Sequence, residues 1–301
     1  MLFNILTVIS IFLLQSRAIV AHVHDVNELS ALPSENSPFR LGNITYFSRQ
    51  HFIESGSRCR TEDYTETERI ELNTELSRLD VATTSELRMR PIRVFFHVIQ
   101  SSSKKGSVSD AVIKSQISVL NRAYSKSGIS FTLAGTDKTT NNAWFSARPN
   151  SGALSDMKRK LRRGSYADLN VYTTQQIDNT IGFATLPKKV GKDIAFDGVV
   201  IDYRTLPKGQ FFPYNAGHTL THETGHWLGL EHTFRGGCAV SHSAGDNIAD
   251  TPAERAPNSG CPSDSTDTCP GNNGALRGKD PIHNYMDYTD DSCMDNFTSK
   301  Q

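Results

Sequence analysis

The stretch from Thr219 to His232 decides the fold and reads Thr-Leu-Thr-His-Glu-Thr-Gly-His-Trp-Leu-Gly-Leu-Glu-His. His222 and His226 are four residues apart, so on a helix both imidazoles lie on one face, one turn apart. Gly229 can adopt a left-handed backbone conformation and end that helix sharply. The chain can then turn back and carry His232 to the same point. The spacing therefore predicts three histidines that converge on one metal ion.

The ligand types favour zinc, and the neighbouring residue favours catalysis. Three neutral imidazoles leave a fourth position on zinc for water, whose pKa the metal lowers. Glu223 directly follows the first ligand and can take the proton of that water and pass it to a leaving amine. A lone His-Glu-x-x-His occurs by chance in many proteins. The added spacing to Gly229 and His232 makes this pattern much more specific.

The extended run resembles the metzincin signature His-Glu-x-x-His-x-x-Gly-x-x-His. Metzincins also have a methionine turn beneath the metal, and the segment Asn-Tyr-Met-Asp-Tyr at 284–288 is similar to it, with Met286 as the apolar floor. The resemblance extends to the pappalysin-like (peptidase M43B) family, in particular to secreted fungal and microbial extracellular metalloproteases. Further matching motifs are Gly236-Gly237-Cys238, Asp250-Thr251-Pro252, Gly260-Cys261-Pro262 and Asp291-Ser292-Cys293.

The resemblance implies a zinc metalloendopeptidase with one Zn²⁺ held by His222, His226 and His232, and Glu223 as general base. Tyr288 would hydrogen-bond the tetrahedral oxyanion. The implied fold is an α/β (α+β) metzincin-type catalytic domain: a mixed twisted sheet, an active-site helix and a disulfide-bonded, loop-rich C-terminal subdomain. Protein or peptide substrates would lie extended beside an edge strand. Assimilation of extracellular or host protein is the expected role.

Five cysteines favour an oxidising compartment and leave one thiol over. Four follow the histidine motif and can pair in three ways; the resemblance implies Cys238–Cys269 and Cys261–Cys293. Ser57-Arg58-Cys59 resembles the family's pro-region switch, in which a thiolate occupies the fourth metal position until the pro-segment is removed. The alternative is a free thiol at Cys59.

The N-terminus predicts export. Leu2–Leu14 is mostly apolar, too short for a membrane span and followed by small residues, so we expect a signal peptide over 1–18, or to 21. The alternatives are a buried strand or an uncleaved anchor. Asn43 and Asn296 begin sequons and are candidate glycosylation sites in a secreted, extracellular protein.

The rest of the chain divides into two expected parts. Residues 19–90 read as a pro-region that lacks a compact apolar pattern, apart from a helix over 66–79, with the maturation cut between Leu79 and Pro91. Residues 91–301 read as the catalytic domain, with an upper subdomain to about 232 and the C-terminal subdomain at 233–301. Periodicity predicts strands at 92–99, 129–134, 169–172, 182–187 and 197–201, and helices at 108–124 and 154–161.

The charge balance of the chain limits the kinds of binding partner to expect. Lysine plus arginine equals aspartate plus glutamate at 32 each, so nothing indicates nucleic acid or membrane lipid, and a monomer is expected. Ten acidic residues against three basic ones between Asp246 and Asp295 indicate either a calcium site or a solvated loop region. Two other functions remain: a zinc-binding protein without catalysis, which Glu223 disfavours, and a zinc amidohydrolase, which the methionine turn and pro-region disfavour.

Overall fold

The structure is a computed structural model that describes residues 36–41, 44–78, 90–175, 180–191, 193–238, 245–271 and 276–301. The predicted signal peptide, Asn43 and most of the segment expected to hold the maturation cut lie outside the described residues. Within the described ranges, no helix has both the length and the apolar character needed to cross a membrane.

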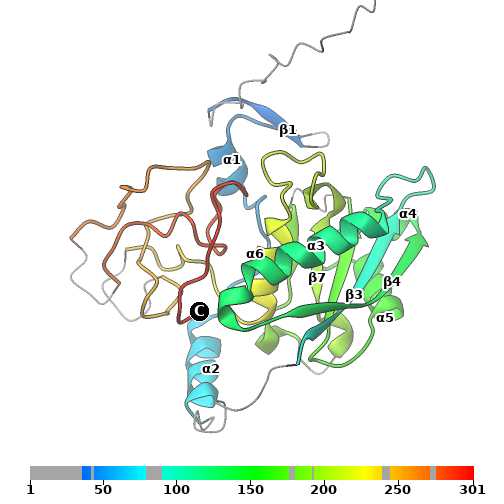
Figure 1. Ribbon diagram of the computed structural model, residues 1–301, viewed down its shortest axis with the longest axis horizontal. Coiled ribbons are helices and arrows are strands. Elements are labelled where there is room, and N and C mark those ends of the chain that lie inside the picture. Colours follow the sequence, from blue (N-terminus) through cyan, green and yellow to red (C-terminus); the bar gives the residue numbers. More distant parts are fainter. Residues whose placement is uncertain are drawn as a thin grey trace, which may run out of the picture. The chain divides into compact units, whose positions relative to one another are not determined.

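A five-stranded mixed sheet carries the site (Figure 1). Its strands are β3 (Ile92–Gln100), β4 (Phe131–Thr140), β5 (Leu169–Thr174), β6 (Gly182–Ala184) and β7 (Val199–Asp202). They lie in the order β4-β3-β5-β7-β6; the first four are parallel, and β6 pairs antiparallel with β7 at the edge. The predicted α/β fold with a mixed sheet is therefore confirmed.

Helices cover both faces of this sheet, as a mainly parallel sheet requires. The core on one face joins Val94, Phe96 and Val98 of β3 to α3 (Asp110–Ala123) and α6 (His218–Trp227). The core on the other joins Ile99 to α4 (Asn142–Phe145) and α5 (Gly152–Leu161). Short 3-10 turns at Ser125–Ser127, Pro187–Lys189, Ile194–Phe196 and Tyr203–Thr205 connect these elements.

Strand β4 is longer than the sequence predicted. It continues past Ala134 to Thr140, where burial alternates residue by residue. The prediction stopped where the apolar residues stop, whereas a strand at a sheet edge can expose every second side chain and still pair through its backbone. Helix α4 was not predicted, because a four-residue helix is too short to leave a periodic pattern.

The segment before residue 79 is more ordered than its composition suggested. It contains β1 (Phe39–Leu41), β2 (Ile44–Tyr46), α1 (Arg49–Glu54) and α2 (Glu66–Arg78). Phe52 is fully buried and stacks on Tyr214, with ring centroids 5.6 Å apart. The segment thus shares a core with rings from a distant part of the chain, and its assignment as a pro-region stays a prediction.

The part after α6 is loop-rich. Among its described residues there is no helix or strand, and only one isolated bridge joins Asn284 to Asn296. Disulfides Cys238–Cys269 and Cys261–Cys293 tie it together, and these are the two pairs that the family resemblance implied. Cross-links of this kind stabilise a segment that cannot rely on secondary structure.

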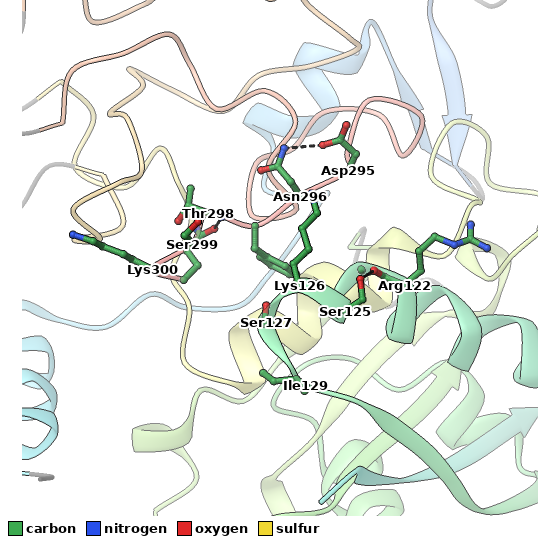
Figure 2. A pocket seen from close by; sticks show the side chains of 13 residues that line it. Arg122, Ser125, Lys126, Ser127, Ile129, Asp295, Asn296, Thr298, Ser299 and Lys300 are labelled. Atoms are coloured by element: carbon green, nitrogen blue, oxygen red, sulfur yellow. Dashed lines mark hydrogen bonds between the residues drawn. The ribbon is translucent and has the colours of Figure 1, made fainter. Parts of the chain in front are cut away.

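A cavity of about 400 Å³ lies where this part meets the end of α3 (Figure 2). Residues 295–301 line one side, and Arg122, Lys126 and Ile129 line the other. Asn296 is half-buried there, and its amide Nδ2 donates to Asp295 Oδ1 at 2.7 Å. Glycosylation of Asn296 stays a prediction.

Candidate metal centre

Helix α6 is buried from Thr219 to Trp227 and fixed at both ends. Near its start, Asp291 Oδ2 accepts from the backbone N–H groups of Ala216 (2.7 Å) and His218 (3.3 Å), a favourable place for a carboxylate. At its end, Trp227 Nε1 donates to Asp197 Oδ1 at 2.8 Å. The side chains that α6 presents are therefore held on a rigid element.

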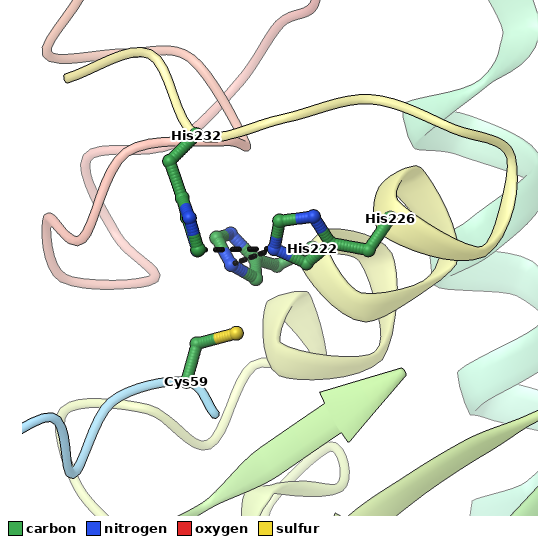
Figure 3. A group of neighbouring side chains, drawn as sticks. All are labelled: Cys59, His222, His226 and His232. Atoms are coloured by element: carbon green, nitrogen blue, oxygen red, sulfur yellow. Dashed lines mark hydrogen bonds between the residues drawn. The ribbon is translucent and has the colours of Figure 1, made fainter. Parts of the chain in front are cut away.

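Three histidines converge beside α6 (Figure 3). His222 and His226 come from successive turns of the helix, and Gly229, with a φ of 106°, turns the chain back to His232. His226 Nε2 lies 3.1 Å from His222 Nε2 and 3.0 Å from His232 Nε2. The predicted ligands are thus brought together by the predicted turn.

The donor set fits a cation. The Nδ1 atoms of His222 and His226 face the carbonyl oxygens of Tyr285 (2.7 Å) and Leu230 (2.8 Å), which can only accept. Nδ1 of His232 faces the Asp63 carboxylate at 3.1 Å. Each ring therefore carries its hydrogen on Nδ1 and turns a bare lone pair of Nε2 toward the other two. Three lone pairs at this separation repel one another unless a metal ion lies among them, and zinc accepts this ligand set.

Burial keeps the rings of His222 and His226 neutral, as ligation requires. It lowers the pKa of His226 to about 3, with a further contribution from His232, and lowers the pKa of His222 well below its usual range. Both rings therefore present lone pairs, not positive charges, at neutral pH.

Met286 lies directly against the helix between the two ligands. It is fully buried, and a methyl group placed on Gly225 would come within 2.4 Å of its Sδ. Glycine at this position of α6 is therefore what allows the methionine to pack under the metal centre. The predicted turn explains Gly229, whereas no sequence pattern indicated the need for glycine at 225.

Glu223 lies on the same helix, buried and close to the edge strand. Its Oε2 accepts from Thr61 Oγ1 at 2.8 Å, and its Oε1 has no partner within the described part of the chain. A methyl group on Gly182 of β6 would come within 2.8 Å of that Oε1, so glycine leaves room for the carboxylate. Burial raises the pKa of Glu223 to about 7, which suits a group that must both take and give a proton.

Tyr288 reaches the site from the methionine turn. Its hydroxyl lies 3.0 Å from His232 Nε2, and its ring lies edge-on to that imidazole. The phenol is therefore within reach of an atom bound at the centre, although it is two residues beyond Met286.

The segment around Cys59 fills the centre from the opposite side. Cys59 is buried, and its thiol belongs with the three histidines to a group whose ligand atoms all lie within 4.8 Å of one another. The backbone follows β6: Ile181 N–H donates to Ser57 O and Arg60 N–H to Gly182 O, both at 3.1 Å. The segment thus pairs with edge strand β6, and an extended substrate was predicted to lie beside such an edge strand.

Two residues that follow Cys59, Thr61 and Asp63, make contacts with the site that no sequence pattern predicted. Thr61 Oγ1 accepts from Ala184 N–H of β6 (2.8 Å) while donating to Glu223. Asp63 holds Nδ1 of His232, and that imidazole with the other charges nearby lowers the pKa of Asp63 to about 2 despite its burial. Thr61 and Asp63 therefore join the candidate general base and a candidate ligand to the segment that was predicted to be a pro-region.

The acidic region between 246 and 295 does not form a comparable centre. Glu254 and Asp287 are buried side by side, and Asn258 bonds to both. Burial raises the pKa of Asp287 to about 7 and that of Glu254 well above its usual value. Across the described ranges, the histidine–cysteine group is the one set of metal-binding side chains that converges tightly enough. Calcium binding stays a prediction.

Comparison with known proteins points to one family. The family model described as "Pregnancy-associated plasma protein-A" (Peptidase M43) matches residues 155–301. An extracellular metalloprotease of Sordaria macrospora is 46% identical over 215 residues, which cover 70% of this chain and 71% of that protein. One from Neurospora crassa is 41% identical over 242 residues, covering 77% of this chain and 81% of that protein.

Solved structures point the same way. A variant of promirolysin from Tannerella forsythia is 28% identical, with a TM-score of 0.62, and the match covers 81% of this chain and 90% of that one. Mature mirolysin in complex with a cleaved peptide is 32% identical, with a TM-score of 0.57, covering 70% and 89%. The match to the pro-form thus extends over more of this chain than the match to the mature form.

Proposed function

Because this chain belongs to the pappalysin-like peptidase M43 family and is a zinc metalloendopeptidase, we propose that it is secreted as a latent precursor and hydrolyses extracellular proteins with Glu223 as general base. Assimilation of environmental or host protein is the role we propose. The supporting observation is the convergence of three imidazoles, with His226 Nε2 at 3.1 Å from His222 Nε2 and 3.0 Å from His232 Nε2, beside a buried carboxylate that has one oxygen without a partner among the described residues.

His222, His226 and His232 would hold the zinc. When bound, zinc supplies an acidified water and polarises the carbonyl of the scissile peptide bond. Glu223 accepts the proton of the attacking water and delivers it to the leaving amine, a double task that its pKa of about 7 favours. The backbone of β6 pairs with the extended substrate, and buried α6 keeps Glu223 aligned.

Tyr288 is proposed to donate its hydroxyl hydrogen to the oxyanion that forms when the carbonyl is attacked. The Tyr288→Phe variant is expected to lose roughly 10²-fold in kcat, as when one oxyanion donor is removed elsewhere, with KM little changed. Steady-state kinetics on a short peptide would measure this. An unchanged kcat would reduce Tyr288 to a packing residue.

Latency is proposed to rest on residues 19–90, with 91–301 as the mature enzyme. Cys59 would occupy the fourth zinc position, while Thr61 engages Glu223. Until the pro-region is cut away, no substrate could pair with β6, and Glu223 would remain hydrogen-bonded to Thr61.

Casein cleavage by the processed chain tests the proposed function. A zinc chelator is expected to abolish cleavage, and added zinc to restore it, because the three histidines have no other role in the chemistry. Magnesium serves as the matched control, since it disfavours imidazole ligands and should restore nothing. A folded, zinc-loaded, processed chain that cuts no protein would contradict the proposal.

A further inference from the structure

Two lysines lie just beyond the edge strand, and acidic residues of the pro-region cover them. Lys188 and Lys189 belong to the turn at Pro187–Lys189 that follows β6. Lys188 Nζ lies 2.8 Å from Glu75, and Lys189 Nζ lies 3.6 Å from Glu62. Weaker pairs at 3.9 Å join Lys188 to Glu71 and Lys189 to Glu68. Every carboxylate that pairs with these lysines in the described part of the chain comes from residues 62–75, within the proposed pro-region.

A third cation lies in a neighbouring cavity of about 380 Å³. Lys158 of α5 lines it, with only 2% of its surface exposed, and donates to the backbone oxygen of Phe196 at 2.8 Å. No carboxylate of the described residues pairs with its ammonium group. The other charged side chains around the cavity are Lys189 and, from the pro-region, Arg60 and Glu62. Among the described residues that line the cavity, removal of the pro-region therefore leaves two lysines and no acidic side chain.

The path of the pro-region relates these lysines to the metal centre. From Cys59, which lies against the histidines, the chain runs along β6 in the same direction as the strand and reaches Lys189 with Glu62. An extended chain advances about 3.3 Å per residue. A substrate paired with β6 would therefore carry a residue about three positions from its scissile bond to Lys189, which lines the same cavity as Lys158 and directly follows Lys188 in the chain.

We propose that, in the mature enzyme, Lys188, Lys189 and Lys158 form a subsite for an acidic side chain of the protein substrate, about three residues from the scissile bond. This rests on the proposed function, whose substrate class it narrows. In the precursor, Glu62 and the acidic face of α2 occupy the subsite. The enzyme would prefer substrates whose acidic residues replace them.

Two series of fluorogenic peptides with one scissile bond test the subsite on the processed chain. Each series carries Glu, Gln or Lys three residues from that bond, one series on its amino side and the other on its carboxyl side. In one of the two series, the Glu peptide is expected to exceed the Gln peptide roughly fivefold in kcat/KM, mainly through KM, as for a well-placed ion pair. The advantage should fall in 1 M NaCl, where the Debye length is about 3 Å.

Variants separate this subsite from general folding effects. The Lys188→Ala/Lys189→Ala double variant should lose the advantage while cleaving the Gln peptide as before, and Lys189→Glu should prefer the Lys peptide. Lys114→Ala, an exposed lysine on α3, is the matched control and should keep the preference. Equal rates for Glu and Gln peptides in both series, or an advantage that survives the double variant, would overturn the subsite. Failure to cut any peptide would refute the proposed function and the subsite with it.

Discussion

Replacing Glu223 by alanine is expected to lower kcat on casein or a peptide by about 10²- to 10⁴-fold, the usual contribution of a general base. The carboxylate is buried beside the three histidines, and its Oε1 has no partner in the described part of the chain, which leaves that oxygen available to accept the proton of the attacking water. Zinc binding should survive, because the backbone oxygens of Tyr285 and Leu230, and not Glu223, hold the ligand rings of His222 and His226.

The control for Glu223→Ala must separate chemistry from folding. Glu223→Gln keeps the shape of the side chain and should be nearly as inactive, whereas Asp110→Ala, which removes an exposed carboxylate paired with Lys138, should behave like the parent. Zinc content near one per chain in all three variants would show that the centre is intact. Substantial cleavage by Glu223→Gln would assign the general base to another residue.

The full-length Cys59→Ala variant is expected to cut peptides without processing. If the bond between zinc and the thiolate stabilises the closed precursor by only about 3 kcal/mol, its loss would raise the fraction of molecules with an accessible site by roughly 100-fold. Activity should still fall short of the mature enzyme, because Thr61 continues to occupy Glu223 and the backbone continues to cover β6. Peptide cleavage by the uncut chain, verified by its mass, measures the effect.

The double variant Cys59→Ala/Glu223→Ala is the negative control for that assay. It should cleave peptides no faster than the parent full-length chain. Thr61→Val combined with Cys59→Ala should release further activity, since the hydroxyl that engages Glu223 is then gone. If Cys59→Ala remains as latent as the parent chain, the thiol is a passive core residue. Latency would then rest on steric cover alone.

The sequence predicted the ligand set and the fold class because both depend on local spacing. His222, His226, Gly229 and His232 fix one helix and one turn, and the apolar periodicity fixes the sheet and its main helices. The polar second half of β4 was not predicted to be a strand, because backbone hydrogen bonds and not apolar side chains pair it with β3. The polar network did not follow from the sequence: Thr61 reaches Glu223 across 162 positions, and no local pattern encodes such a contact.

The packing of the segment before residue 79 illustrates the same limit. Within its own segment, Phe52 contacts the ring of Tyr46. This small aromatic group becomes part of a core because Tyr214 and Phe211 lie against Phe52. Likewise, the acidic residues of α2 read as a solvated face until Lys188 and Lys189 are placed against them. Long-range partners, not local propensity, decide what these side chains do.

Zinc K-edge X-ray absorption on the zinc-loaded full-length chain tests the central claim most directly, because it reports the ligands themselves. We expect one zinc per chain, with three imidazole nitrogens at about 2.0–2.1 Å and one sulfur at about 2.3 Å. The sulfur should be absent from the Cys59→Ala variant and from the processed enzyme. A shell without imidazole scattering would contradict the metal centre, and a full-length chain without the sulfur would contradict the role of Cys59.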